Sequence, residues 1–136
     1  MSLIVSDEGL KRILDLLTTG TGLGNIRIGL YQNNYTPVHT SVLLSFTPAT
    51  FVGYGVVTPA YGAATVAAHV GTTVDAAART FTCSGTATPN TIYGYYVYDS
   101  VAGVTLFAEE FASPQSIANI GDQISLTSQF SLTSQY

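Results

Sequence analysis

The chain has 136 residues and a mass of 14.3 kDa, which is the size of one domain able to bury its own core. Only 9% of the residues are charged, and the formal net charge is −4. A hydrophobic content of 46% argues against a disordered chain, and four basic residues are too few to neutralise a nucleic-acid backbone. The sequence contains no run of 18 apolar residues, so we expect neither a spanning helix nor a membrane partner.

The first predicted element is a helix over residues 6–19. Ser6 can cap it, Asp7 and Glu8 lie in the first turn where the helix dipole favours anions, and Gly20 can end it. Its apolar stripe consists of Leu10, Ile13, Leu14 and Leu17. A helix this short needs a docking partner, which is either its own sheet or a neighbouring subunit.

Everything after the helix is predicted to be strand or loop. Residues 26–31 alternate between apolar and other side chains, which indicates a half-buried strand. Residues 38–48 are predicted to be a loop with residues 42–44 tucked inside. The further expected strands are residues 51–57, the pair 65–70 and 79–84, the hairpin 91–99 with 104–111, and a last strand that begins near residue 123.

Short strands separated by frequent turn signals are typical of an antiparallel sandwich. We therefore predict a mainly β fold: an antiparallel β-sandwich or jelly-roll-like domain with one N-terminal amphipathic helix. The whole chain, residues 1–136, is expected to be one domain, with the sandwich over 26–132 and a repeated extension over 131–136.

The C-terminal segment contains a tandem repeat, in which Ser-Leu-Thr-Ser-Gln-Phe at residues 125–130 is followed by Ser-Leu-Thr-Ser-Gln-Tyr at 131–136. A six-residue insertion keeps the period of two, so Ile124, Leu126, Phe130 and Leu132 share one face. The second copy either continues a strand of its own chain or adds to the sheet edge of a neighbour.

The titratable residues form no recognisable catalytic or metal-binding pattern. His39 and His69 are far apart in sequence, and Cys83 is the only cysteine, expected to be a small buried hydrophobe. We expect no metal, no cofactor and no enzymatic activity. Glu109 and Glu110 point to opposite faces of a strand, which makes a structural ion pair with a strand-borne arginine, either Arg27 or Arg79, the favoured interpretation.

The segment from Tyr93 to Tyr98 is unusually rich in tyrosine. Strict alternation would place Tyr96 and Tyr98 with Ile92 on one face, and Tyr93 and Tyr95 with Val97 on the other. One face would be core, and the other would present aromatic rings suited to a protein interface or to stacking on sugars.

Several strings, taken together, resemble small virion structural proteins of tailed bacteriophages, particularly capsid decoration (cement) proteins. The resemblance spans roughly residues 8–132. It is carried by the strings at residues 8–14, 26–37, 51–55, 81–85, 92–97, 106–114 and 121–126.

The resemblance implies a non-enzymatic shell component, trimeric, that binds the major capsid protein on the outside of the virion after assembly in the cytoplasm of the host bacterium. The alternative is a tail-fibre domain that binds a receptor or carbohydrate. Capsid attachment predicts apolar docking edges at the helix and the C-terminal strand, whereas the fibre alternative predicts an exposed aromatic patch. The candidate interface residues are Leu10, Ile13, Leu14, Leu17, Tyr93, Tyr95, Phe130, Leu132 and Tyr136.

Overall fold

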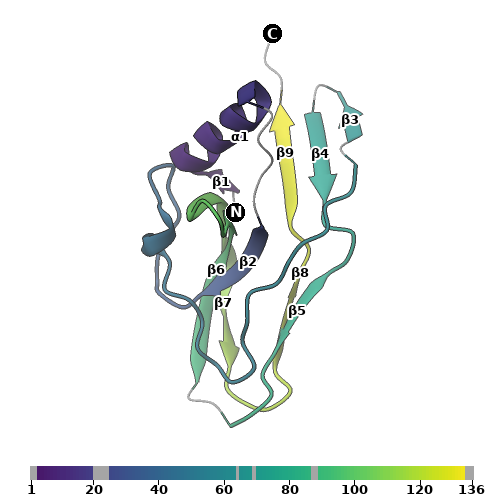
Figure 1. Ribbon diagram of the computed structural model, residues 1–136. Coiled ribbons are helices and arrows are strands. Elements are labelled where there is room, and N and C mark those ends of the chain that lie inside the picture. Colours follow the sequence, from purple (N-terminus) through teal and green to yellow (C-terminus); the bar gives the residue numbers. More distant parts are fainter. Residues whose placement is uncertain (1–2, 20–24, 64, 69, 87–88, 134–136) are drawn as a thin grey trace.

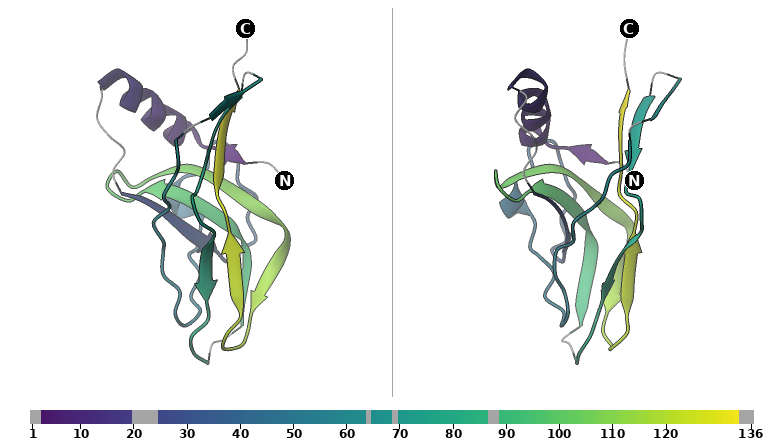
Figure 2. Two further views of the ribbon diagram at one scale, coloured as in Figure 1. Left: turned by 90° about the vertical axis from the view of Figure 1, so that its right-hand side faces the viewer. Right: turned by 45° about the vertical axis from the view of Figure 1, so that its right-hand side comes forward.

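The computed structural model describes residues 3–19, 25–63, 65–68, 70–86 and 89–133 (Figure 1). It confirms a mainly β chain with antiparallel sheets and one helix near the N-terminus. The strands form two layers, which Figure 2 shows from two further directions. The layers converge at the end of the molecule away from the helix and separate towards the helix.

The first layer is a four-stranded antiparallel sheet with the order β1-β7-β6-β2. Its centre is the predicted hairpin, β6 (Asn90–Asp99) with β7 (Val104–Ile117), flanked by β2 (Ile26–Tyr31) and β1 (Ile4–Val5). β7 runs six residues beyond the predicted end, through Pro114. Because β1 pairs with β7 only at Phe107 and Ala108, one edge of this distal half is unpaired among the described strands, and a proline is tolerated there.

The second layer is a long twisted ribbon. In it β4 (Val70–Val74) pairs with β9 (Gln129–Thr133), and β5 (Arg79–Thr82) pairs with β8 (Gln123–Leu126). The short strand β3 (Thr65–Ala67) pairs with β4 on its other side. The predicted pairing of 65–70 with 79–84 is therefore wrong, because β3 and β4 form a tight hairpin and β5 reaches the C-terminal segment instead.

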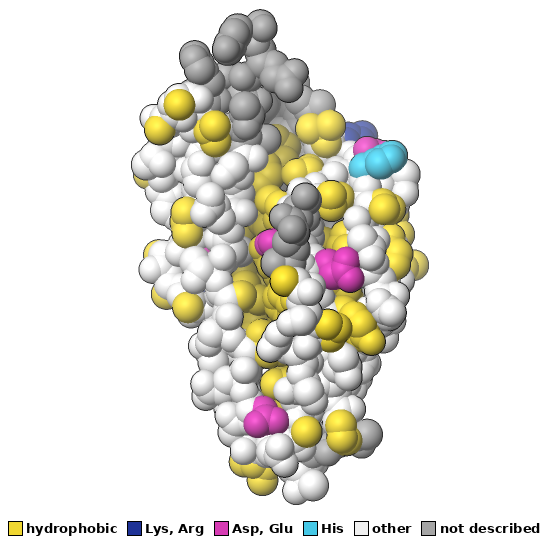
Figure 3. Space-filling view, turned by 180° about the vertical axis from the view of Figure 1, so that it is seen from behind, with side chains coloured by type: hydrophobic (Ala, Val, Ile, Leu, Met, Phe, Trp, Pro, Cys, Tyr) yellow, Lys and Arg dark blue, Asp and Glu magenta, His cyan; other side chains and the backbone are white. Residues whose placement is uncertain are grey.

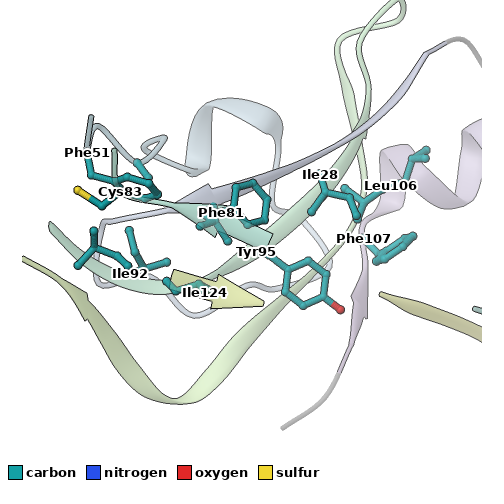
Figure 4. Close-up of a cluster of buried hydrophobic side chains, with 13 residues drawn as sticks. Ile28, Phe51, Phe81, Cys83, Ile92, Tyr95, Leu106, Phe107 and Ile124 are labelled. Carbon is teal, nitrogen blue, oxygen red and sulfur yellow. The ribbon is translucent and has the colours of Figure 1, made fainter. Parts of the chain in front are cut away.

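The main core lies between the two layers (Figure 4). β2, β6 and β7 contribute side chains from the sheet, and β5 and β8 contribute Phe81 and Ile124 from the ribbon. Cys83 is buried here among apolar side chains, as predicted.

A second cluster covers the outer face of the four-stranded sheet. Tyr31, Tyr96 and Ala108 point outward, and Phe46 from the loop after β2 packs on them, with its ring stacked on that of Tyr96 at 5.0 Å between centroids. β2 is therefore covered on both faces, and the expectation of a half-buried strand is wrong. The outer face of β2 is covered by the long connection that follows it. The alternation within residues 26–31 carries no information about that distant segment.

The helix α1 (Asp7–Thr19) begins as predicted. The Ser6 hydroxyl accepts a hydrogen bond from the backbone N–H of Gly9 at 2.9 Å and donates one to the Thr105 carbonyl. The helix lies so close to β7 that a Cβ on Gly9 would stand 2.2 Å from the Leu106 carbonyl oxygen. The helix docks on its own sheet, because the small residues Ser6 and Gly9 allow its backbone to approach β7 closely.

Two sequence expectations in the connecting segments are wrong. Residues 51–57 form no strand, because Gly53 has a φ of +88° and the Tyr54 N–H donates to the Phe51 carbonyl, which makes a turn. Residues 42–44 are not all tucked inside: Leu43 packs partly buried against the second cluster, but Val42 is exposed. The 3₁₀ helix η1 (Leu43–Ser45) presents Leu44 to solvent with 95% of its surface exposed.

Candidate interaction surface

An apolar groove opens where the two layers separate, between α1, the inner face of the four-stranded sheet and the ribbon. It encloses about 270 Å³. Figure 3 shows hydrophobic side chains gathered in a strip along the middle of this face. The groove is lined by Ile13, Ile26, Tyr61, Thr73, Val97, Leu106, Phe107 and Phe130.

The wall of the groove on the ribbon side depends on an interruption between β8 and β9. Ser128 lies in this interruption, fully buried, with its hydroxyl 2.7 Å from the Tyr61 hydroxyl and its carbonyl accepting from the Asp75 N–H at 3.0 Å. Beyond it the ribbon continues towards the helix end, and Phe130 stacks on Phe107 of the sheet at 5.4 Å. The groove therefore combines the helix with the last described strand.

A polar cluster fixes the bend of the ribbon beside Ser128. The Asp75 carboxylate is buried and accepts two hydrogen bonds from the Arg79 guanidinium, at 2.7 and 2.6 Å, and one from the Ala60 N–H at 3.0 Å. The guanidinium, together with these backbone donors, holds the pKa of Asp75 below its ordinary value. The cluster is satisfied internally, so its role is to position the ribbon.

A second apolar feature is the Leu44 loop, residues 38–46. Its backbone is held by side chains: the Asn33 amide donates to the Ser45 carbonyl at 2.9 Å and accepts from the Thr47 N–H at 2.8 Å. The Ser45 hydroxyl accepts from the Val42 N–H at 3.1 Å. Its only signal in the sequence is the apolar run at 42–44, which suggests burial and not exposure. The loop is an ordered support for an exposed leucine.

The expected helix stripe is divided by the structure. Ile13 lines the groove, while Leu10 is 51% exposed and is not part of the lining. The side chains of Leu14, Leu17 and Leu132 lie outside the described part of the structure, although their backbones belong to α1 and β9. Phe130 lines the groove, and Tyr136 lies outside the described residues, as does His69.

The expected faces of the tyrosine-rich strand are correct beyond Gly94, where Tyr96 lies with Tyr98 and Tyr95 with Val97, and wrong for Ile92 and Tyr93. Between Ile92 and Gly94, β6 advances two residues while β7 advances five, and beyond this irregularity Ile92 shares the core face with Tyr95 and Val97, while Tyr93 packs with the outer cluster. An irregularity of this kind disrupts the ladder locally, so the alternation does not carry across it. Tyr95 is only 5% exposed and therefore is not on a presented face.

The expected ion pair of a strand glutamate with Arg27 or Arg79 is also wrong. Glu109 accepts a hydrogen bond from the Tyr95 hydroxyl at 2.8 Å, Arg27 donates to the Thr58 hydroxyl at 2.6 Å, and Arg79 is taken by Asp75. Burial, and then the neighbouring carboxylate, raise the pKa of Tyr95. The tyrosine stays protonated and acts as a donor, which is a structural role.

The described residues offer little chemistry. Within them no group of three or more His, Cys, Asp or Glu side chains is placed to hold a metal ion. His39 lies on the surface with its Nδ1 3.2 Å from an Asp7 carboxylate oxygen. No helix in the described part of the chain is long and apolar enough to cross a membrane.

Comparisons with known proteins give no assignment: no protein-family model matches the chain, and no curated protein matches it at a significant level.

Proposed function

We propose that this chain is a non-enzymatic structural protein of a bacteriophage virion, a capsid decoration protein that binds the outer capsid lattice and stabilises the shell. The observation that carries the proposal is the position of the apolar groove. Ile13 of α1 and Phe130 of β9 line it, so uncovered apolar surface lies at the helix and at the last described strand. These are the two docking edges that capsid attachment requires.

The composition of the surface supports the same function. Side chains that carry formal charge make up 9% of the chain, and none of them lines the groove. Charged residues are depleted at the cores of protein interfaces, because desolvating them costs free energy. A homotrimer on a three-fold position, which we also propose, would add several modest contacts into strong attachment to the major capsid protein.

The tail-fibre alternative requires an exposed aromatic patch. The tyrosines of β6 argue against it: Tyr95 and Tyr96 are buried in the two hydrophobic clusters, and Tyr93 and Tyr98 are partly buried against the outer one. The rings therefore serve packing and do not form a platform for sugars.

The test is immunogold electron microscopy of intact particles of a phage whose genome encodes this chain, with antibody raised against the recombinant protein. Label distributed over the capsid faces is the expected result. Label confined to the tail would favour the fibre alternative, and particles without label would refute a virion role. Particles treated with non-immune antibody provide the control.

A further inference from the structure

The apolar groove has the dimensions and chemistry of a site for protein side chains. Its volume of about 270 Å³ lies below the 300–1,000 Å³ that is typical of small-molecule sites. Such sites also place several polar groups to orient a ligand, whereas the groove lining is almost entirely aliphatic and aromatic. A projecting apolar side chain of a protein is the occupant that fits.

The Leu44 loop provides such a side chain on the same chain. Leu44 is almost wholly exposed on a backbone that Asn33 and Ser45 hold by side-chain hydrogen bonds. Holding a loop in its bound conformation lowers the entropy cost of association. Residues 38–46 carry no Asp, Glu, Lys or Arg, so docking the loop desolvates none of these charged groups.

The loop and the groove lie on opposite sides of the four-stranded sheet. The loop packs through Phe46 on the outer face, with Tyr96 and Ala108. The groove lies on the inner side, where Val97 and Phe107 contribute to its lining. Figure 1 shows η1 as the short blue coil at the left and β4 and β9 at the right. Leu44 therefore points away from the groove of its own chain and cannot occupy it.

We propose that copies of this chain associate head to tail, with Leu44 of one copy seated in the apolar groove of the next. A contact between two different surfaces closes into a ring or continues as a chain, depending on the rotation between copies. The inference rests on the proposed function in taking the groove as a protein-docking site of a shell component, and it names a neighbouring copy, not the major capsid protein, as the occupant of the groove itself.

The first experiment measures self-association of the full chain by sedimentation velocity over a concentration series. The unmodified chain is expected to form oligomers, and Leu44→Asp to raise the dissociation constant at least tenfold. The matched control is Ile120→Asp, because Ile120 is also an exposed apolar side chain, 66% exposed, in a different loop. Monomers of the unmodified chain at all concentrations, or equal effects of the two substitutions, would overturn the proposal.

The second experiment identifies the contact by disulfide crosslinking. Cys83 is buried, so an introduced cysteine is the accessible thiol among the described residues. A mixture of Leu44→Cys and Thr73→Cys chains should crosslink on mild oxidation, whereas each variant alone and a mixture of Ile120→Cys with Thr73→Cys should not. Crosslinking of Leu44→Cys chains to one another would indicate a face-to-face contact and refute the arrangement. All three variants are first checked for native circular dichroism.

The two proposals fail separately. Particles labelled by antibody, combined with a protein that stays monomeric, would retain the virion role and refute head-to-tail association. Oligomers that crosslink as expected, combined with particles that carry no label, would support head-to-tail association and refute the virion role.

Discussion

Replacing Ser6 by alanine tests how the helix is attached to the sheet. The hydroxyl of this residue, which is 2% exposed, has two hydrogen bonds: it accepts from the Gly9 N–H and donates to the Thr105 carbonyl. Loss of an N-cap of this kind costs about 1 kcal/mol. Loss of the second buried bond costs roughly another 1 kcal/mol. We therefore expect Ser6→Ala to lower the free energy of unfolding by about 2 kcal/mol.

Thermal unfolding followed by circular dichroism measures this loss. The entropy of unfolding is roughly 2.1 cal/mol/K per residue, which for 136 residues gives about 0.29 kcal/mol/K, so Tm should fall by about 7 °C. The Tm of Ser6→Gly should fall less than that of Ser6→Ala, because glycine at an N-cap costs only a few tenths of a kcal/mol. The control is Ser116→Ala at an exposed position of β7. A Tm for Ser6→Ala within about 2 °C of that control would refute the reasoning.

Three further outcomes follow from the described contacts. The Arg79 guanidinium lowers the pKa of Asp75, so the stability that this carboxylate contributes is complete above its unfolded pKa, near 3.8, and is lost as pH falls through the lower folded value. Urea unfolding at pH 5 and pH 2.5 should therefore show a smaller acid-induced loss in Asp75→Asn than in the unmodified chain. Gly94→Ala should prevent recovery of folded protein, because its Cβ would stand 2.2 Å from a backbone carbonyl oxygen, whereas Gly62→Ala, with its nearest atom at 3.9 Å, should be recovered normally. Tyr95→Phe removes the hydrogen bond to a carboxylate and should cost about 1.5–3 kcal/mol in urea unfolding; an unchanged midpoint would contradict that contact.

The parts of the fold that the sequence predicted correctly are those decided by local pattern. The Ser6 cap, the central hairpin and the even-numbered apolar face of the C-terminal segment all appear in the structure. The apolar face of the C-terminal segment continues across the break in the ribbon. Two residues separate β8 from β9, and an even number of inserted residues keeps the even-numbered side chains on one face. Ser128, itself even-numbered, is buried in that break.

The errors occur where a distant segment or a single irregularity decides the outcome. The irregularity between Ile92 and Gly94 exchanged the expected faces of Ile92 and Tyr93, and alternation carries no signal for a bulge. Arg79 was expected to neutralise a strand glutamate, but a loop conformation set by the ribbon brings Asp75 to it. The groove could not be predicted, because its walls come from segments that are far apart in the sequence. They are the helix and residues 26, 61, 73, 97, 106, 107 and 130.

The groove follows from the way that the ribbon is built. At the end away from the helix, β5 and β8 complete the main core against the sheet. Past the buried cluster of Asp75, Ser128 and Tyr61, the ribbon rises beside α1 and leaves Phe130 as a link to the sheet. A small sheet with one apolar face is marginal in water unless that face is covered. The sheet β3-β4-β9 presents Thr73 and Phe130 to the groove, so an occupant that covers them would stabilise the ribbon as well as bind it. On this argument the folding of this end of the molecule and its docking are linked.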